Sequence, residues 1–251
     1  MARRLGIMGG RRLRPTRKEP AMPDMLQLMK NRHDVRNYSD EPIAPEVVER
    51  LQREIDAANE IAGMHIQLVQ DDPKGISGFM AAYEQFKNVK NYLVMVGPNT
   101  GRLDEQCGYF GEHLVLIAQH LGLNTCWAGL GFNRKKGSFE KRDGERAAIA
   151  IAIGHGRNQG ASKEMPAASD ISNLNADSPE WFRQGIEAVR LAPTVLDEQG
   201  IRIDLMDTAN PDGRRHVRVI AAEKGHFNYI DFGIAKYHFE TIAGTSNFVW
   251  V

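Results

Sequence analysis

The sequence predicts a mixed fold of helices and strands in which one arrangement of elements occurs twice along a single chain. Two observations lead to this prediction. Segments with the 3.6-residue spacing of helices alternate with short apolar runs typical of strands. A similar order of elements also stands on both sides of one segment rich in glycine, alanine, serine and asparagine. The length of 251 residues fits one large domain or two small ones.

The first part of the chain contains two helical patterns and three strand patterns. Pro45 stands at a position that suits the first turn of a helix, and the apolar residues that follow it recur at helical spacing. The run at 92–96 is bounded by Gly97 and Pro98, which is typical of a buried strand. We expect helices over residues 45–58 and 109–121, and strands over residues 66–69, 92–96 and 147–153.

The second part repeats this pattern. An amphipathic helix is expected to begin with Ser178 as its N-cap and Pro179 at its first position. Two alternating segments follow, then a helix and a short terminal strand. The expected elements are helices over residues 179–191 and 229–242, and strands over residues 201–205, 217–222 and 248–251.

Internal duplication is suggested by matching positions in the two parts. Pro45-Glu46 and Pro179-Glu180 each open a helix that leads to a strand. Gly111 and Gly122 have the same separation as Gly233 and Gly244, and an aromatic residue follows each second glycine. The simpler interpretation is that helices and strands alternate in many chains. We favour duplication, with half one over 22–160, a linker over 161–178 and half two over 179–251.

Composition and charge exclude several classes of protein. Hydrophobic residues make up 42% of the chain, which is enough for a core. Lys plus Arg and Asp plus Glu are both 32, so no basic excess points to nucleic acid. No apolar run is long enough to span a membrane. Cys107 and Cys126 cannot make a disulfide framework, so a reducing, cytoplasmic location is expected.

Residues 1–21 form a basic arm that we exclude from the fold. The first twenty residues hold seven Arg or Lys residues against Glu19 alone. No apolar stretch makes this a secretory signal, and the segment lacks the serine content of organellar transit peptides. We expect a disordered arm. An alternative is that translation starts at Met22 or Met25.

A pair of arginines precedes the first helix within the segment Arg32-His33-Asp34-Val35-Arg36. On a helical turn, Arg32 and Arg36 would face the same way and could hold one anion. The planar guanidinium suits phosphate because it donates two hydrogen bonds at once. From spacing alone, an exposed basic turn in which Asp34 is an internal partner is the better interpretation.

Two loops could contact a flat ligand. Ala192-Pro193-Thr194 through Gln199 ends a helix and offers a hydroxyl and an amide, although an ordinary turn has the same features. The segment from Gly122 to Gly131 is expected to be a loop in which glycines let backbone N–H groups approach a ligand. It lacks the spacing of a dinucleotide-binding loop.

Other motifs favour structural roles. The eight histidines form no metal-binding motif with each other or with the cysteines, so we expect no metal. Cys126 has no evident base nearby and is expected to be buried rather than nucleophilic. His238 is expected to be a structural histidine and Trp127 part of the core. The basic cluster of Arg134-Lys135-Lys136 with Lys141-Arg142 could attract the phosphates of a dinucleotide, but a solvated loop is the better interpretation.

Taken together, these residues resemble the flavin-dependent nitroreductase family, and its Thermotoga-type branch in particular, in which two nitroreductase-like halves are fused. The resemblance covers roughly residues 25–251. Arg32-His33-Asp34-Val35-Arg36 is similar to the family's Arg-x-Ser-x-Arg phosphate clamp. Residues 108–112 and 121–127 resemble its central helix and following loop, and 150–156 its late strand. Residues 192–199 resemble its Ala-Pro-Ser-x-x-Asn-x-Gln-Pro flavin loop.

The resemblance implies an α+β fold, the nitroreductase-like three-layer arrangement. It also implies an intramolecular pseudo-dimer with central mixed or antiparallel sheets flanked by helices. Three departures stand out. Asp34 replaces the clamp's Ser, where a carboxylate would repel phosphate unless Arg32 or Arg36 neutralises it. Asp197 and Gly200 replace the loop's Asn and Pro. Half one lacks the flavin loop, and half two lacks the clamp.

The resemblance further implies an FMN-dependent oxidoreductase. NADH or NADPH would reduce FMN, which would reduce an electron-poor acceptor such as a nitroaromatic or quinone by a ping-pong mechanism. One FMN per chain is expected, in a monomer or homodimer, with no catalytic side chain. The implied cofactor-binding residues are Arg32, His33, Asp34, Arg36, Asn124, Thr125, Gly129, Lys163, Pro193, Thr194, Asp197 and Gln199. The alternatives are a flavin-binding or flavin-free protein without turnover, or another flavin reaction such as reductive dehalogenation.

Overall fold

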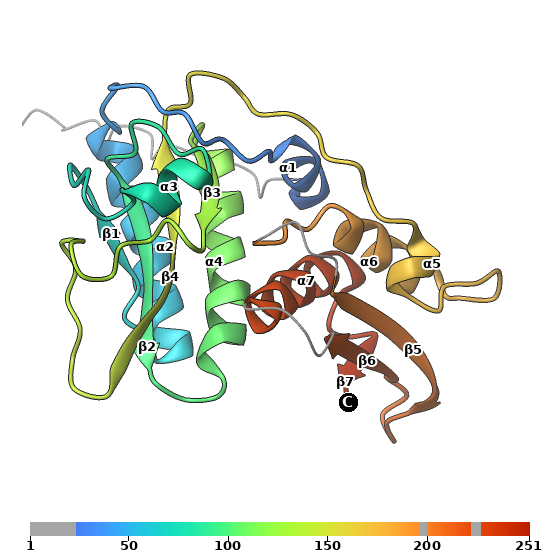
Figure 1. Cartoon of the computed structure of the whole chain (residues 1–251). Coiled ribbons are helices and arrows are strands. Elements are labelled where there is room, and N and C mark those ends of the chain that lie inside the picture. The colour runs from blue at the N-terminus through green and yellow to red at the C-terminus, as the bar shows by residue number, and fades with distance from the viewer. Residues whose placement is uncertain (1–23, 196–199, 222–226) are drawn as a thin grey trace, which may run out of the picture.

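The computed structural model describes residues 24–195, 200–221 and 227–251, which form two sheets with a layer of helices between them. The expected basic arm, residues 1–21, lies wholly outside the described residues. Figure 1 shows the larger sheet on one side of helices α4 and α7, and the smaller sheet on the other. The α+β class predicted from the sequence is therefore confirmed.

The larger sheet has four strands in the order β1-β2-β4-β3, and every neighbouring pair is antiparallel. Its central strands have apolar side chains on both faces because helices cover one face and loops cover the other. Its four strands are β1 (Gln67–Val69), β2 (Tyr92–Pro98), β3 (Asn124–Ala128) and β4 (Glu145–Gly154).

Helices α2 (Pro45–Ala62) and α4 (Leu103–His120) cover one face of this sheet. Leu51 and Ile55 of α2 pack with Leu114 of α4 and with Leu93 and Ile151 of the sheet. The opposite face is covered by the extended chain around Val35 and by a short helix, α3 (Phe79–Tyr83).

The smaller sheet has three strands in the order β5-β6-β7. Strands β5 (Ile201–Ala209) and β6 (Arg215–Ala221) are antiparallel, whereas β7 (Phe248–Trp250) runs parallel to β6. Helices α6 (Glu180–Arg190) and α7 (Asn228–Ala243) pack on it through a cluster of aromatic side chains. The aromatic residues of this cluster include Phe182, Phe239 and Phe248.

Helices α4 and α7 cross at a point where two glycines allow the backbones to approach. A Cβ at Gly108 would overlap the carbonyl oxygen of Ile230, and a Cβ at Gly233 would overlap that of Glu105. Each helix therefore presents a glycine to the backbone of the other, and side chains at these two positions would push the helices apart. Among the described residues, no helix is long and apolar enough to cross a membrane.

Most expected elements are present, but several local predictions were wrong. The segment predicted as a loop after Gly122 contains β3, which pairs with β4. Pro179, not Ser178, is the N-cap of α6, and it makes no side-chain capping bond; the Ser178 hydroxyl instead accepts the N–H of Asn175. The linker contains one turn of helix, α5 (Ala168–Ile171). The sequence interpretation did not include α1 (Met25–Asn31) or α3.

Candidate functional site

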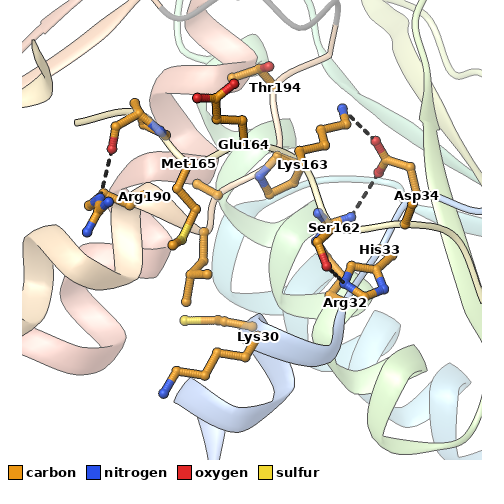
Figure 2. A pocket seen from close by; sticks show the side chains of 16 residues that line it. Lys30, Arg32, His33, Asp34, Ser162, Lys163, Glu164, Met165, Arg190 and Thr194 are labelled. Atoms are coloured by element: carbon orange, nitrogen blue, oxygen red, sulfur yellow. Dashed lines mark hydrogen bonds and ion pairs between the residues drawn. The ribbon is translucent and has the colours of Figure 1, made fainter. Parts of the chain in front are cut away.

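A pocket of about 400 Å³ lies beside the linker, between the chain around the end of α1 and the chain around the end of α6. Its volume is in the range of small-molecule sites. Figure 2 shows side chains from three separate segments facing it. The lining residues come from three ranges. Residues 29–34 span the end of α1 and the chain after it, residues 161–166 belong to the linker, and residues 190–194 span the end of α6 and the chain after it.

Arg32 enters this pocket because α1 stops directly before it. Arg32 is the C-cap of α1 and its backbone is extended, with its N–H donating to the carbonyl of Leu28. The following chain runs beside β3, where the N–H of Val35 donates to the carbonyl of Thr125 over 3.1 Å. In extended chain, residues two apart share a face, so Arg32 and Asp34 point to the same side.

Asp34 joins two cations. Its Oδ1 lies 2.8 Å from Nη1 of Arg32, and its Oδ2 lies 2.9 Å from Nζ of Lys163. Burial opposes ionisation of Asp34, but the charges of Arg32 and Lys163 outweigh it and hold the pKa of this carboxyl below its usual value. Burial likewise disfavours the charge on Arg32, and Asp34 more than compensates, raising the pKa of Arg32. Both groups are therefore charged at neutral pH.

Arg32 has one polar atom that Asp34 does not satisfy. Its side chain is only 7% exposed, and its Nε is buried without a hydrogen-bond partner among the described residues. Buried donors are nearly always paired in folded proteins, so this unpaired Nε at the pocket wall is an exception. The cationic side chains of Arg32 and Lys163 could thus donate hydrogen bonds to an oxygen atom of a ligand, whereas the negative charge of Asp34 would repel an anionic ligand.

The linker is held by close backbone contact against residues 32–36, called the clamp segment below. Gly160 has a φ of +72°, and a Cβ there would lie 2.7 Å from the carbonyl oxygen of Asp34. His33 adds contacts from its ring nitrogens to the carbonyl oxygen of Gln159 at 3.3 Å and to the hydroxyl of Ser162 at 3.5 Å. These contacts bring Lys163 over Asp34, as Figure 2 shows.

The end of α6 forms the other wall. Pro193 is buried and Thr194 is partly exposed, and both line the pocket. Arg190 is fixed by its Nε, which donates to the carbonyl of Pro166 over 2.8 Å, and by a salt bridge of 2.7 Å to Glu187. Val195, directly after the pocket, donates its N–H to Asp231 over 2.9 Å. Asp197 and Gln199 lie outside the described residues.

The structure brings together about half of the site residues predicted from the sequence. Arg32, His33, Asp34, Lys163, Pro193 and Thr194 all line the pocket. The other described residues lie nearby or behind it. Arg36 faces the buried thiol of Cys126. The Asn124 amide accepts the N–H of Gly156 and donates to Gln159, and Thr125 is buried in β3. Gly129 lies behind the pocket wall, against Val195 and Phe227. Their predicted contacts with a cofactor stay predictions.

The predicted structural roles of nearby residues agree with their burial. Cys126 is 2% exposed, and burial raises the pKa of its thiol to about 12, so it is no nucleophile at neutral pH. Trp127 is buried, and its ring N–H donates to Glu112. His238 is fully buried, between the carbonyl of Ala188 and the carboxylate of Glu112.

Several pocket residues were not found from the sequence. Met29 and Lys30 lie on α1, which was not predicted, and Glu164 and Met165 lie in a linker without a regular pattern. A helical signal was present in the segment before Arg32, where Asp24 caps α1 by accepting the N–H of Gln27 over 3.1 Å. The helix has only seven residues, too few to show a clear apolar periodicity.

Comparison with known proteins gives a consistent result. The solved structure of a protein from Thermotoga maritima, described as a "putative nitroreductase", superposes with a TM-score of 0.56 at 17% identity, over 92% of this chain and 87% of that one. An FMN-dependent nitroreductase of Clostridium difficile covers 60% of this chain and 98% of its own, with 18% identity and a TM-score of 0.43. A protein of Desulfovibrio desulfuricans, described as a "putative nitroreductase in complex with fmn", covers 63% of this chain and 100% of its own, with 20% identity and a TM-score of 0.45.

The first likeness supports the fold, while the other two are too distant to support an inference about this chain. A comparison with curated proteins found no match. The model of one protein family, described as "Putative TM nitroreductase", matches residues 24–243, which include the larger sheet, strands β5 and β6 of the smaller sheet, the central helices and every segment of the pocket. This match supports an oxidoreductase function, and the chain belongs to this nitroreductase family.

Proposed function

We propose that this protein is an FMN-dependent oxidoreductase that is reduced by NADH or NADPH and in turn reduces an electron-poor small molecule, such as a nitroaromatic or a quinone. The observation that supports this most directly is the pocket between the two halves, which combines a buried arginine and a lysine with the apolar residues that follow α6, Leu191, Ala192 and Pro193. When bound, FMN would accept a hydride from the nicotinamide and pass electrons to the acceptor.

The chain's own residues would bind and orient the cofactor. Arg32 and Lys163 would face the polar end of the flavin, because they are the cations that line the inner pocket. Pro193 and Thr194 would contact the ring from the side of α6. No side chain is assigned an acid or base role, since water could supply protons to the acceptor.

The stoichiometry follows from the unequal halves. The arginine clamp stands only in half one and the Ala-Pro-Thr loop only in half two, so we propose one FMN per chain. Reductant and acceptor would then use the same pocket in turn, which gives ping-pong kinetics. We also propose that the two halves arose by internal duplication.

The test is the visible absorption spectrum of the purified protein, before and after adding FMN, and then after adding NADH or NADPH without oxygen. We expect a bound-flavin band that bleaches with at least one nicotinamide. Bound flavin that is never reduced would favour a flavin-binding protein without turnover. Failure to bind flavin at all would exclude the proposal.

The acceptor is then identified by reoxidation of the reduced protein. A nitroaromatic, a quinone and a halogenated phenol are each mixed with it, and the return of the oxidised band is timed. Faster reoxidation by the nitroaromatic or quinone supports the proposed reaction. Selective reoxidation by the halogenated compound, with release of halide, would replace it with reductive dehalogenation.

A further inference from the structure

The two cations of the pocket already share an anion from the chain itself. Asp34 places one carboxylate oxygen 2.8 Å from Arg32 and the other 2.9 Å from Lys163. A phosphate group bound by the same two side chains would need the same donors. Figure 2 shows the Asp34 carboxylate between these two side chains, and we infer that it occupies the position where they would hold a ligand's phosphate.

Asp34 cannot readily move away from this position. Its side chain is 12% exposed. The backbone on one side is tied to β3 through the hydrogen bond between Val35 and Thr125, and on the other side Gly160 of the linker packs against the carbonyl of Asp34. A ligand that displaced the carboxylate would also leave a buried charge without its partner, which is unfavourable.

The charges around the pocket do not favour a second anion. Arg32 and Lys163 together carry two positive charges, and Asp34 removes one of them. Arg190 is already paired with Glu187, and the other charged lining residues, Lys30 and Glu164, are exposed and of opposite sign. A phosphate monoester carries about −1.5 to −2 charges at pH 7, more than the one remaining positive charge would balance.

A hydroxyl group fits the same surroundings better. A hydroxyl can donate to the Asp34 carboxylate, whereas a phosphate at neutral pH offers almost only acceptors and would face that carboxylate with like charge. The hydroxyl oxygen can also accept a hydrogen bond from the ammonium group of Lys163, whose side chain lines the pocket and is 45% exposed. The inner pocket thus has both a donor and an acceptor for one neutral polar group.

We propose, on the basis of the flavin-dependent function above, that Asp34 is a specificity-determining residue that makes the pocket bind flavins without using the phosphate. The ligand class is then a flavin with a hydroxyl-ended side chain, riboflavin included, and FMN gains little from its phosphate. Binding energy comes from the ring and the ribityl chain, and the flavin exchanges more readily than one clamped by phosphate.

The first experiment compares the wild-type protein with both ligands. The dissociation constants of FMN and riboflavin are measured by quenching of flavin fluorescence in the same buffer. We expect the two constants to agree within about threefold, because a well-formed charge-assisted contact would separate them by about tenfold or more. FMN binding more than about tenfold tighter would overturn the inference and leave the proposed function intact. Binding of neither flavin would overturn both.

The second experiment removes the carboxylate charge. Asp34→Asn keeps the size and a hydrogen-bond acceptor, so Arg32 and Lys163 become available to phosphate. We expect the FMN dissociation constant to fall by about tenfold or more while that of riboflavin changes by less than about threefold. An equal change for both flavins, or no change for either, would contradict the assignment.

Two further variants serve as controls. One tests the effect of removing a negative charge elsewhere, and the other tests the role of Lys163, which pairs with Asp34. Asp212→Asn removes the same charge from an exposed pair with Arg214 in the turn between β5 and β6, and should leave both constants unchanged. Lys163→Gln combined with Asp34→Asn should abolish most of the gain for FMN, because the phosphate then lacks one cation. If Asp34→Asn fails to fold, the wild-type comparison of FMN with riboflavin still decides the question.

Discussion

The two halves of the molecule use similar elements but build different sheets. In the larger sheet, β4 lies between β2 and β3 and is antiparallel to both, so β2 and β3 run in the same direction. In the smaller sheet, β7 pairs directly with β6 and is parallel to it. Each half thus contains two antiparallel strands, a helix and a third strand parallel to the second, and β4 is the extra strand of the first half.

This difference explains where burial is concentrated. With β4 in place, the larger sheet is wide enough to be covered on both faces, and β2 and β4 are buried along most of their length. The smaller sheet has a core on the side of α6 and α7, and the far part of β5 is exposed. The two halves contact each other through α4 and α7. Substitutions in these two helices should therefore show most directly how the contact between the halves stabilises the protein.

The largest effect is expected from the polar contact that joins the halves. The carboxylate of Glu112 in α4 lies 3.0 Å from Nε2 of His238 in α7 and accepts the ring N–H of Trp127 over 3.2 Å. All three side chains are buried. Glu112→Ala leaves a histidine and an indole without an acceptor and should lower the free energy of unfolding by about 3–5 kcal/mol in urea denaturation.

Glu112→Gln is the matched control. Its amide can accept from Trp127 and donate to a neutral His238, so the loss should be less than half of that for alanine. Equal losses for the two variants would mean that the hydrogen bonds at this border contribute little.

The next effect concerns the crossing of α4 and α7. Gly233→Ala places a methyl group against the backbone of α4, where the N atom of Tyr109 lies 2.6 Å from the new Cβ. Gly108→Ala makes the reciprocal contact with Ile230. We expect each to cost about 2–3 kcal/mol, after the better helix propensity of alanine is counted, in thermal or urea unfolding.

Because each added methyl group meets the backbone of the opposite helix, these two costs should be similar. Gly101→Ala, at a position with nothing near the added methyl group, is the control and should be close to neutral. A large loss of stability for one glycine substitution and none for the other would show that the two helices do not depend equally on this close approach.

A smaller effect is expected at the linker. Gly160→Ala forces a side chain into a positive φ and against the carbonyl oxygen of Asp34. The cost should be about 1–2 kcal/mol in urea unfolding, of which part is backbone strain. Gly213→Ala in the turn between β5 and β6 has a φ of +89° and open space around it, so it measures the strain alone. Equal costs would show that the linker contact is loose.

The smallest effect is the pH dependence of the Asp34 contact. Because its pKa is lower in the folded protein than its ordinary value, the ionised carboxylate stabilises the fold above that ordinary value. This contribution is lost as the pH falls through the folded pKa. The stability of wild type relative to Asp34→Asn should be constant above about pH 5 and decline below it, measured by urea unfolding.

Asp212 in the second half is the comparison for this profile. Hydrogen bonds from Arg214 lower the pKa of its carboxyl too, but the pair is exposed to water. Because solvent screens exposed pairs, Asp212→Asn should leave the profile unchanged. A profile that depends on Asp212 as much as on Asp34 would remove the distinction between the two contacts.

Long periodic segments could be predicted from the sequence, and short ones could not. The helix that begins at Pro45 and the strand that begins at Tyr92 have regular apolar spacing, and both are present. Strand β3 has only five residues, including Asn124 and Thr125, and glycines flank it, so it was interpreted as a loop. Its strand conformation depends on pairing with β4, which is distant in the sequence.

The site could be predicted in outline because its parts carry local signals. Arg32, Lys163 and Thr194 were each singled out, and the structure brings them to one pocket. The sequence suggested Arg32 or Arg36 as the partner of Asp34, and Arg32 is one of its two partners. Lys163 was expected to contact a ligand's phosphate, and its ion pair with Asp34 could not be foreseen. That contact depends on how the linker folds back over the clamp segment.

Because the linker joins the segments that form the pocket, formation of the pocket should not depend on protein concentration. A pocket built from two separate subunits disappears when the subunits dissociate, so its occupancy depends on protein concentration. Here the end of α1, the linker and the end of α6 are covalently joined, and their effective concentration is fixed by the chain. Lowering the protein concentration should therefore leave the number of pockets per chain unchanged, and ligand concentration alone should set how many are filled.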